Sequence, residues 1–336
     1  MKPKLASIAD LAKLAGVSKS TVSRALSGSP LVGAETRERI EALAREHGFR
    51  PNLPARYLSL GSSRSVAFVT SDCSPCGAGS GSADLFNLEI MGGVAQGLRE
   101  LGYDMLALYV EPGDEGWIAD YLDSGLVAGF ILMTYEQKSR RLELLAEREA
   151  PFIAWGIGEG RYCSVTGDNA SGGRLAADRL LGRGARRIAF LGGPEDDLES
   201  GERRRGFSEL LSEAGLPLES ERLVFGDYSE ESGALAMERL LKADPKLDAV
   251  FAASDLMAIG AMRVLKARGL RIPEDVAVVG YDDLRLAAYV SPSLTTISQH
   301  ISLTGKLLAR DLVAFLGSGV VTNRVVPVEL VARDSA

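Results

Sequence analysis

Short apolar runs alternate with helical stretches from Ser65 onward, and this alternation limits the folds available to most of the chain. Runs such as SVAFVTS, RIAFLGG and VAVVGYD have the composition of buried strands, and helices of about 10–15 residues separate them. Buried strands joined in this way form parallel βαβ units, which bind ligands beyond the carboxyl ends of the strands. The scheme occurs twice, over about residues 65–165 and 170–295. We therefore expect an α/β body of two similar lobes that face a cleft.

Two further segments follow the second lobe. The string TTISQHISLTGKLLARDLVAFLGSG predicts a helix, and VVPVELVARD predicts a final strand, so that the chain crosses back between the lobes. We expect lobe 1 to hold about residues 65–166 and 296–323. Lobe 2 is expected to hold about residues 167–295 and 324–336.

The N-terminal segment shows a different pattern, with three short helical stretches. Ser7 and Asp10 have the spacing of a capping box, and Gly16 ends the helix that follows. Ser18 can cap a second helix, which the string SGSP closes. A third amphipathic helix is predicted over about residues 35–46. Two helices joined by a tight turn that contains Gly form the outline of a helix-turn-helix unit.

These patterns predict three parts of the chain. Residues 1–49 form a helix-turn-helix head, and residues 65–336 form the two-lobed body. Residues 50–64 are punctuated by Pro and Gly and are expected to be a linker that contains a short hinge helix.

The charge is distributed unevenly between these parts. Residues 1–60 hold ten basic and five acidic side chains, a formal charge of +5, although the whole chain carries −7. A small basic head on an acidic body suits a module that binds a polyanion.

Targeting signals are missing from the sequence. No stretch is apolar enough to span a bilayer core of ~30 Å, and the N-terminus lacks the apolar run of a secretory signal. Cys73, Cys76 and Cys163 are too few for a disulfide framework. We therefore expect a cytoplasmic protein. The C-x-x-C pair leaves a thiol-redox or metal signal open, but no fourth ligand or nearby His completes a zinc site.

Several motifs together resemble the lactose/galactose repressor (LacI/GalR) family in order and spacing, over nearly the whole chain. The resemblance implies a homodimeric transcriptional regulator with a periplasmic-binding-protein-like body and a small effector, and we expect it to be a repressor. The motifs are SIADLAKLAGVSKSTVSRALSG, NLPARYLSLGSSRSVAF, DNASGG, RRRGF, FAASDLMAIGAMRVL, IPEDVAVVGYDD and SPSLTTISQ.

The resemblance places a recognition helix in the major groove of double-stranded operator DNA, a pseudo-palindrome read by two heads. Its base-reading residues are Lys19, Ser20 and Arg24, of which the two cations can donate to guanine. Hydroxyl groups suited to phosphates or to helix caps are those of Ser7, Ser18, Thr21 and Ser23.

The hinge carries the sharpest prediction from the resemblance. Leu58 is expected to insert into the minor groove at a central base step and to kink the DNA. Arg56 supports it through phosphates or the groove floor. A helix this short is unfavourable alone because nucleation is costly, so we expect it to form only with the partner hinge and DNA.

The resemblance also implies an effector site between the lobes, at strand ends and adjoining turns. Its residues are Arg203, Tyr228, Ser254, Asp282 and Gln299. An aromatic ring suits stacking on a pyranose or a base, while Arg203 and Asp282 suit vicinal hydroxyls. Wall candidates are Phe86 and Trp155, and for Trp155 a core position is equally compatible.

The identity of the effector stays open. The string SDCSPCGAGSGSADLFN replaces an Asn-Pro-Phe-Phe-like string of many relatives, and Ser254 stands where Asn is common. A faint resemblance of TYEQKSRRLELLAEREAPFIAWG to glycoside-responsive members favours a sugar. A nucleobase or a phosphorylated metabolite remains an alternative.

Other function classes fit less well. His47 and His300 are the only histidines, and no GxSxG motif precedes His300 as a triad would require. GAGSGS lacks dinucleotide-loop spacing. We expect no enzyme activity and no cofactor. An exported sugar-binding protein would need a signal and would leave residues 1–64 unexplained. The run LMAIGAMRVL fits either a dimer helix or a buried helix.

Overall fold

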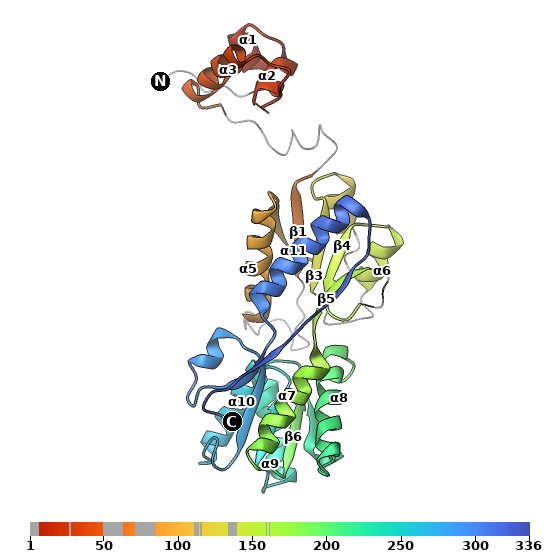
Figure 1. The fold of residues 1–336 in the computed structure, drawn as a ribbon, viewed down its shortest axis with the longest axis vertical. Coiled ribbons are helices and arrows are strands. Elements are labelled where there is room, and N and C mark those ends of the chain that lie inside the picture. Colours follow the sequence, from red (N-terminus) through yellow and green to blue (C-terminus); the bar gives the residue numbers. More distant parts are fainter. Residues whose placement is uncertain are drawn as a thin grey trace. The chain divides into compact units, whose positions relative to one another are not determined.

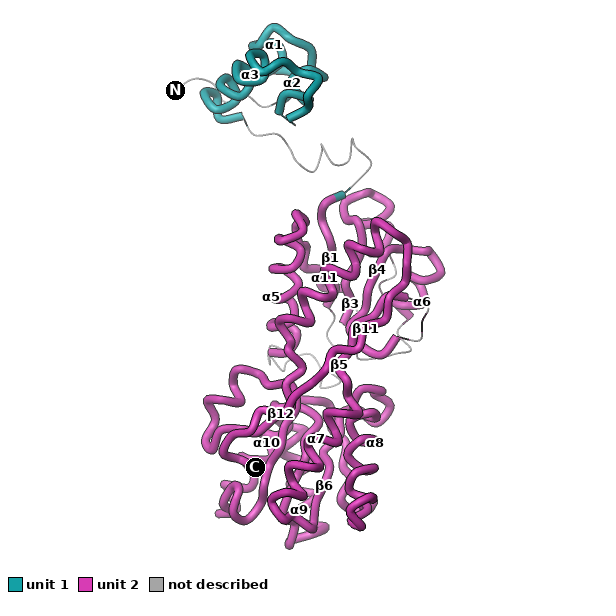
Figure 2. Tube along the Cα trace, viewed as in Figure 1, with its two compact units in different colours: residues 1–63 teal, residues 64–336 magenta. Residues whose placement is uncertain are grey.

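The computed structural model describes residues 7–26, 28–49, 63–70, 85–110, 114, 116–133, 140–158, 160 and 162–336. The chain divides into two compact units, residues 1–63 and residues 64–336 (Figure 2).

In the described residues of the first unit, three helices pack together: α1 (Ile8–Ala15), α2 (Lys19–Leu26) and α3 (Ala34–Glu46). The expected capping box is confirmed: the Ser7 Oγ accepts from the Asp10 backbone N–H at 3.2 Å, and the Asp10 carboxylate accepts from the Ser7 N–H at 3.1 Å. Gly16 ends α1 with φ +67°, a left-handed conformation that suits glycine. The buried core takes residues from all three helices and their flanks: Leu11, Ala12, Ala15, Val22, Ala25, Val32, Ile40, Ala44 and Phe49.

The second unit contains two six-stranded sheets with helices on both faces (Figure 1). The first sheet has the order β11-β5-β4-β3-β1-β2, and all its pairings are parallel. Its strands are β1 (Ser65–Thr70), β2 (Asp104–Tyr109), β3 (Gly129–Met133), β4 (Phe152–Trp155), β5 (Cys163–Gly167) and β11 (Asn323–Val326). Helices α5 (Leu85–Glu100) and α11 (Ile301–Ser318) cover one face, and α6 (Arg140–Glu147) with the π-helical turn η1 (Ala119–Asp123) covers the other.

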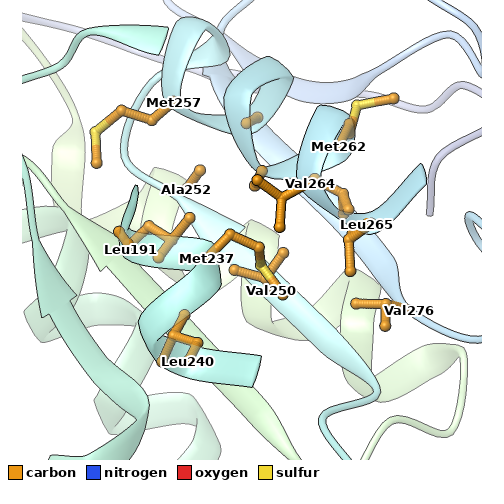
Figure 3. Close-up of a cluster of buried hydrophobic side chains, with 14 of the residues drawn as sticks. Leu191, Met237, Leu240, Val250, Ala252, Met257, Met262, Val264, Leu265 and Val276 are labelled. Atoms are coloured by element: carbon orange, nitrogen blue, oxygen red, sulfur yellow. The ribbon is translucent and has the colours of Figure 1, made fainter. Parts of the chain in front are cut away.

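The second sheet has the order β12-β10-β9-β8-β6-β7. Its strands are β6 (Ile188–Gly192), β7 (Leu223–Phe225), β8 (Ala249–Ala252), β9 (Ala277–Asp282), β10 (Thr295–Ser298) and β12 (Glu329–Val331). Helices α7 (Asn169–Gly182) and α8 (Leu198–Glu213) pack on one face; α9 (Glu230–Ala243) and α10 (Asp255–Ala267) pack on the other. Figure 3 shows the apolar side chains that join α9, α10 and β8. The 3-10 turns η2 (Ser220–Arg222) and η3 (Arg285–Ala288) lie in connections.

The expected α/β architecture with parallel-dominated sheets is confirmed, but the last segments differ from the prediction. Residues 295–298 form β10 of the second sheet, so the predicted helix begins only at Ile301. The predicted single final strand is two strands: β11 pairs in the first sheet, and β12 pairs antiparallel with β10. The chain was expected to cross between the lobes after residues 295 and 323. Because β10 ends at Ser298 and β11 ends at Val326, both crossings fall about three residues later.

The run LMAIGAMRVL lies in α10, and most of it is buried inside the second unit. The buried residues are Met257, Ala258, Gly260, Ala261, Met262, Val264 and Leu265. Interior packing thus accounts for its apolar character. Within the described part of the chain, no helix combines the length and hydropathy needed to cross a membrane.

Candidate DNA-binding and effector sites

Helix α2 presents two distinct faces. Val22 and Ala25 are buried against the other helices of the first unit, whereas Lys19, Ser20, Ser23 and Arg24 are exposed. The predicted base-reading residues therefore share the solvent-facing side of α2. The opposite, buried side holds this helix against the rest of the unit. No acidic residue lies in its first turn.

The hydroxyl residues of this unit divide by role. Ser7 caps α1, and the Ser18 Oγ accepts from the Thr21 N–H at 3.1 Å at the start of α2. Ser18 also contacts the hydroxyls of Ser20 and Thr21 at 2.7 and 2.8 Å. Ser7 and Ser18 therefore shape the helix ends, while Ser23 faces solvent. The predicted hinge residues Arg56 and Leu58 lie outside the described residues.

Arg203 is the centre of the predicted effector residues, but it lies inside α8 and not at a strand end or turn as expected. It is 4% exposed. Its Nε donates to the Asn169 Oδ1 at 2.8 Å, its Nη1 donates to the Ala253 carbonyl at 2.6 Å, and its guanidinium lies 3.9 Å from the ring centre of Tyr281. This position depends on the close approach of α7 and α8.

Two glycines permit that approach. A Cβ at Gly206 of α8 would collide with the Ala170 carbonyl of α7, and a Cβ at Gly173 of α7 would collide with the Arg203 carbonyl. Glycine at both positions lets the backbones touch, which brings Arg203 to Asn169 at the start of α7. Burial by itself lowers the pKa of Arg203, but the surrounding acidic groups raise it overall, so the side chain stays a cation.

The other four residues of this set follow strands of the second sheet, as predicted. The Tyr228 hydroxyl donates to the Asp197 Oδ1 at 2.6 Å, and Tyr228 itself has φ +68°. Burial raises the pKa of Tyr228 well above its ordinary value, so it remains a neutral donor. Ser254 caps α10 by accepting from the Met257 N–H at 3.2 Å, and its hydroxyl lies 3.4 Å from the Tyr228 carbonyl.

Asp282 and Gln299 form a buried pair. Asp282 ends β9, and its Oδ1 accepts from the Gln299 Nε2 at 2.7 Å just beyond β10. The Gln299 Oε1 is buried without a hydrogen-bond partner among the described residues. Asp255 lies nearby, where burial raises its pKa well above the ordinary value and the charge of Asp282 adds to the rise.

Phe86 and Trp155 belong to the first lobe and form a separate aromatic pair. Their ring centres are 5.6 Å apart at an interplanar angle of 55°. Trp155 is only 2% exposed and lies in the core of the first lobe, which supports its core interpretation. Leu284, which follows β9 of the second lobe, belongs to the same apolar cluster. The carboxyl edge of the second sheet therefore contacts the first lobe.

Three polar residues of this region were missed from the sequence: Asn169, Asp197 and Glu199. The Glu199 Oε1 accepts from the Thr166 hydroxyl at 2.7 Å and from the Asn169 Nδ2 at 3.3 Å. Burial raises the pKa of Glu199, and Arg203 opposes the rise. A usable signal was present, because Glu199 and Arg203 are four residues apart and so share one face of a helix.

A groove of about 1120 Å³ runs along the outer face of α8 and the neighbouring chain crossings. None of the predicted effector residues lines it. Its charged side chains pair with one another or with neighbours, as in Arg205 with Glu202 at 2.6 Å and Arg174 with Glu213 at 3.0 Å. It is therefore not the predicted effector site.

Metal chemistry finds no support in the described segments, where no group of His, Cys, Asp or Glu could hold an ion. Cys163 is buried in β5. Cys73 and Cys76 lie outside the described residues, so the sensor hypothesis for the C-x-x-C pair is not tested.

Comparison with known proteins identifies the family. Residues 7–52 match the family described as bacterial regulatory proteins, lacI family, and residues 177–336 match the periplasmic binding protein-like domain. The HTH-type transcriptional regulator CelR of Thermobifida fusca is 38% identical over 308 residues, which cover 90% of this chain and 89% of CelR. The chain belongs to the lacI family.

Solved structures of lacI-family proteins share the fold. A transcriptional regulator CelR–cellobiose complex matches with a TM-score of 0.75 and 34% identity, over 99% of this chain and all of that chain. The lac repressor dimer bound to operator and the anti-inducer ONPF matches with a TM-score of 0.85 and 27% identity, over 99% of both chains. The resemblance seen in the sequence is confirmed, and so is the assignment to transcriptional regulators and not enzymes.

Proposed function

We propose that this lacI-family protein is a cytoplasmic repressor that binds a pseudo-palindromic operator as a homodimer and is controlled by a sugar or glycoside. The observation that carries the DNA-binding part is the arrangement of α2. Its buried Val22 and Ala25 fix the helix, while Lys19 and Arg24 are exposed on a head with an excess of basic residues. Such a face suits the major groove, where cations donate to guanine.

The proposed DNA contacts divide by type. Lys19, Ser20 and Arg24 read base edges, and the hydroxyls of Thr21 and Ser23 bind phosphates. Ser7 and Ser18 act through the helix ends that they cap. In the hinge, Leu58 enters the minor groove and Arg56 supports it.

The proposed effector site lies between the lobes, at the carboxyl edge of the second sheet. Arg203, Tyr228, Ser254, Asp282 and Gln299 bind the ligand. Direct contacts support this set: Ser254 lies beside Tyr228, Gln299 bonds Asp282, and Arg203 reaches the residue before Ser254. Phe86, whose ring packs on the buried ring of Trp155, contributes the facing wall from the first lobe.

A sugar is favoured by the polar character of this set and by the CelR–cellobiose complex among the structural relatives. Repression and dimerisation are favoured by the lac repressor dimer, which that structure shows bound to operator. Because the site takes residues from both lobes, a ligand that prefers one lobe arrangement shifts the population of that arrangement and thereby the affinity for DNA.

Selection of genomic fragments by the purified full-length protein tests the proposal. Fluorescence anisotropy on the selected fragment, with and without cellobiose and other sugars, then measures the response. We expect one pseudo-palindromic site whose affinity exceeds non-specific binding by about 10³-fold or more, and one sugar that changes it. Binding no stronger than to random DNA would contradict the repressor function.

A further inference from the structure

Buried charge in the second unit is strongly one-sided. Among the described residues, the buried charged side chains are those of six acids and of Arg203. Two of the acids have arginine partners away from the proposed site: Asp244 pairs with Arg187, and Asp311 pairs with Arg324. The other four are Asp197, Glu199, Asp255 and Asp282. Glu199 and Asp282 interact electrostatically with Arg203, while Asp197 interacts with Glu199 and Asp255 interacts with Asp282.

The donors that reach two of these carboxyl groups are neutral. Asp197 accepts from the Tyr228 hydroxyl and from the Ser200 N–H at 2.7 Å. Glu199 accepts from Thr166 and Asn169, both on its Oε1. Neither hydrogen-bonds to Arg203, whose Nε and Nη1 donate to Asn169 and the Ala253 carbonyl.

The net charge of the group follows from these contacts. Burial favours the protonated forms of Asp255 and Glu199. With these two carboxyl groups left out, the formal charges of Asp197 and Asp282 still outnumber that of the single buried guanidinium. Asp197 and Ser254 already accept backbone N–H groups at the N-termini of α8 and α10. A phosphate, which carries about −1.5 to −2 at pH 7, would therefore be repelled, whereas sugar hydroxyls can donate to the carboxylates.

We infer that the effector is an uncharged saccharide whose hydroxyl groups donate to Asp197 and Asp282, and that these carboxylates exclude phosphorylated and carboxylated sugars. The inference rests on the proposed sugar-responsive function and assigns Asp197 and Glu199 to specificity. It favours a neutral sugar over a phosphorylated metabolite, which the sequence left open as an alternative.

Charge-matched ligands test the inference on the full-length protein. Thermal shift and calorimetry are run with glucose, glucose 6-phosphate and glucuronate, with galactose and galacturonate, and with cellobiose and cellobionate. We expect a neutral sugar to bind and its anionic counterpart to bind at least about tenfold more weakly. An anionic analogue that binds as tightly as its neutral counterpart overturns the inference but leaves a sugar effector intact. Failure of every sugar, neutral or anionic, overturns the sugar-responsive function as well.

Isosteric variants show whether the carboxylates cause the discrimination. Asp197→Asn removes the charge and keeps a residue that caps helices. It should reduce the ratio of the affinity for the neutral ligand to that for its anionic counterpart at least about fivefold. Asp168→Asn is the matched control, because Asp168 caps α7 in the same way, by accepting from the Ser171 N–H at 3.1 Å. The control should keep the wild-type discrimination. An unchanged gap in Asp197→Asn, with the operator still bound, contradicts the assigned role.

Discussion

The hydroxyl of Thr166 donates to the Glu199 carboxylate at 2.7 Å and thereby joins strand β5 of the first sheet to helix α8 of the second lobe. Asn169 completes the group by donating to both residues and by accepting from Arg203. A ligand on Arg203 is therefore two hydrogen bonds away from a link between the lobes. This short path gives the lobe arrangement a physical connection to the effector site.

Thr166→Val is expected to weaken that link. The variant keeps the shape of the side chain but loses the hydroxyl, so the free energy of unfolding should fall by about 0.5–1.5 kcal/mol and the sugar concentration for half-maximal response should change. Urea unfolding and operator anisotropy measure the two effects. Thr70→Val is the control, since Thr70 bonds Leu108 within one lobe. If both variants show the same sugar response as wild type, Thr166 does not link the lobes functionally.

The pH dependence of stability should report Glu199. Burial raises its pKa above the ordinary value of 4.5, so the folded protein holds this proton more tightly than the unfolded chain does. Its contribution to stability therefore falls as the pH rises above that value. Glu199→Gln removes the titration, and the stability of the variant relative to wild type should rise between pH 5 and pH 8 in urea unfolding.

A neighbouring glutamate provides the control for this pH test. The hydrogen bond from Arg205 lowers the pKa of Glu202, so Glu202 is ionised across the range. The difference between Glu202→Gln and wild type should stay flat from pH 5 to pH 8. A flat difference for Glu199→Gln as well would show that Glu199 does not titrate there.

Arg24→Ala is expected to relax base discrimination at one position of each half-site by about 1–3 kcal/mol, because the exposed guanidinium reads a base edge. Competition anisotropy with single-base operator variants measures it. Arg45→Ala removes the same charge from α3, where Arg45 lies 3.8 Å from Glu41. This control should lower the affinity for every operator variant by the same factor. Unchanged base preference in Arg24→Ala would remove Arg24 from the reading residues.

Leu58→Ala is expected to lower the affinity for the operator far more than the affinity for non-specific DNA. Only the specific complex contains a base step that is kinked by an inserted side chain. Anisotropy on operator and random DNA at the same salt concentration separates the two. Equal losses on both DNAs would refute the wedge role.

Local signals in the sequence predicted the head well. Capping residues and breakers depend only on near neighbours, so Ser7, Gly16 and Ser18 identified the helix ends before any tertiary structure was known. In the body, the apolar runs identified the central strands. The strand TTIS was missed because it is short and not apolar, and its pairing with β9 and β12 decides that it is a strand. The run VVPVELVARD was predicted as one strand, and only pairing with two different sheets divides it into β11 and β12.

Among the effector residues too, positions set by local sequence signals were predicted, whereas positions set by tertiary contacts were not. Asp282 follows an apolar strand and was predicted where the structure has it. Arg203 was misplaced because its position depends on contact between α7 and α8, which two glycines at distant positions permit. For Glu199 the four-residue spacing from Arg203 was a usable signal that was not used, whereas its hydrogen bond to Thr166 of the other lobe could not be foreseen. Contacts between lobes leave no periodic signal in one sequence.

We propose that one chain binds an operator through its head and releases or tightens it through a sugar bound near Asp282. The most direct test is anisotropy of wild type and Asp282→Ala on the selected operator, titrated with the neutral sugar that binds the protein. We predict that both proteins bind the operator and that only wild type responds to the sugar. An Asp282→Ala protein that responds at the same sugar concentration as wild type would contradict the account.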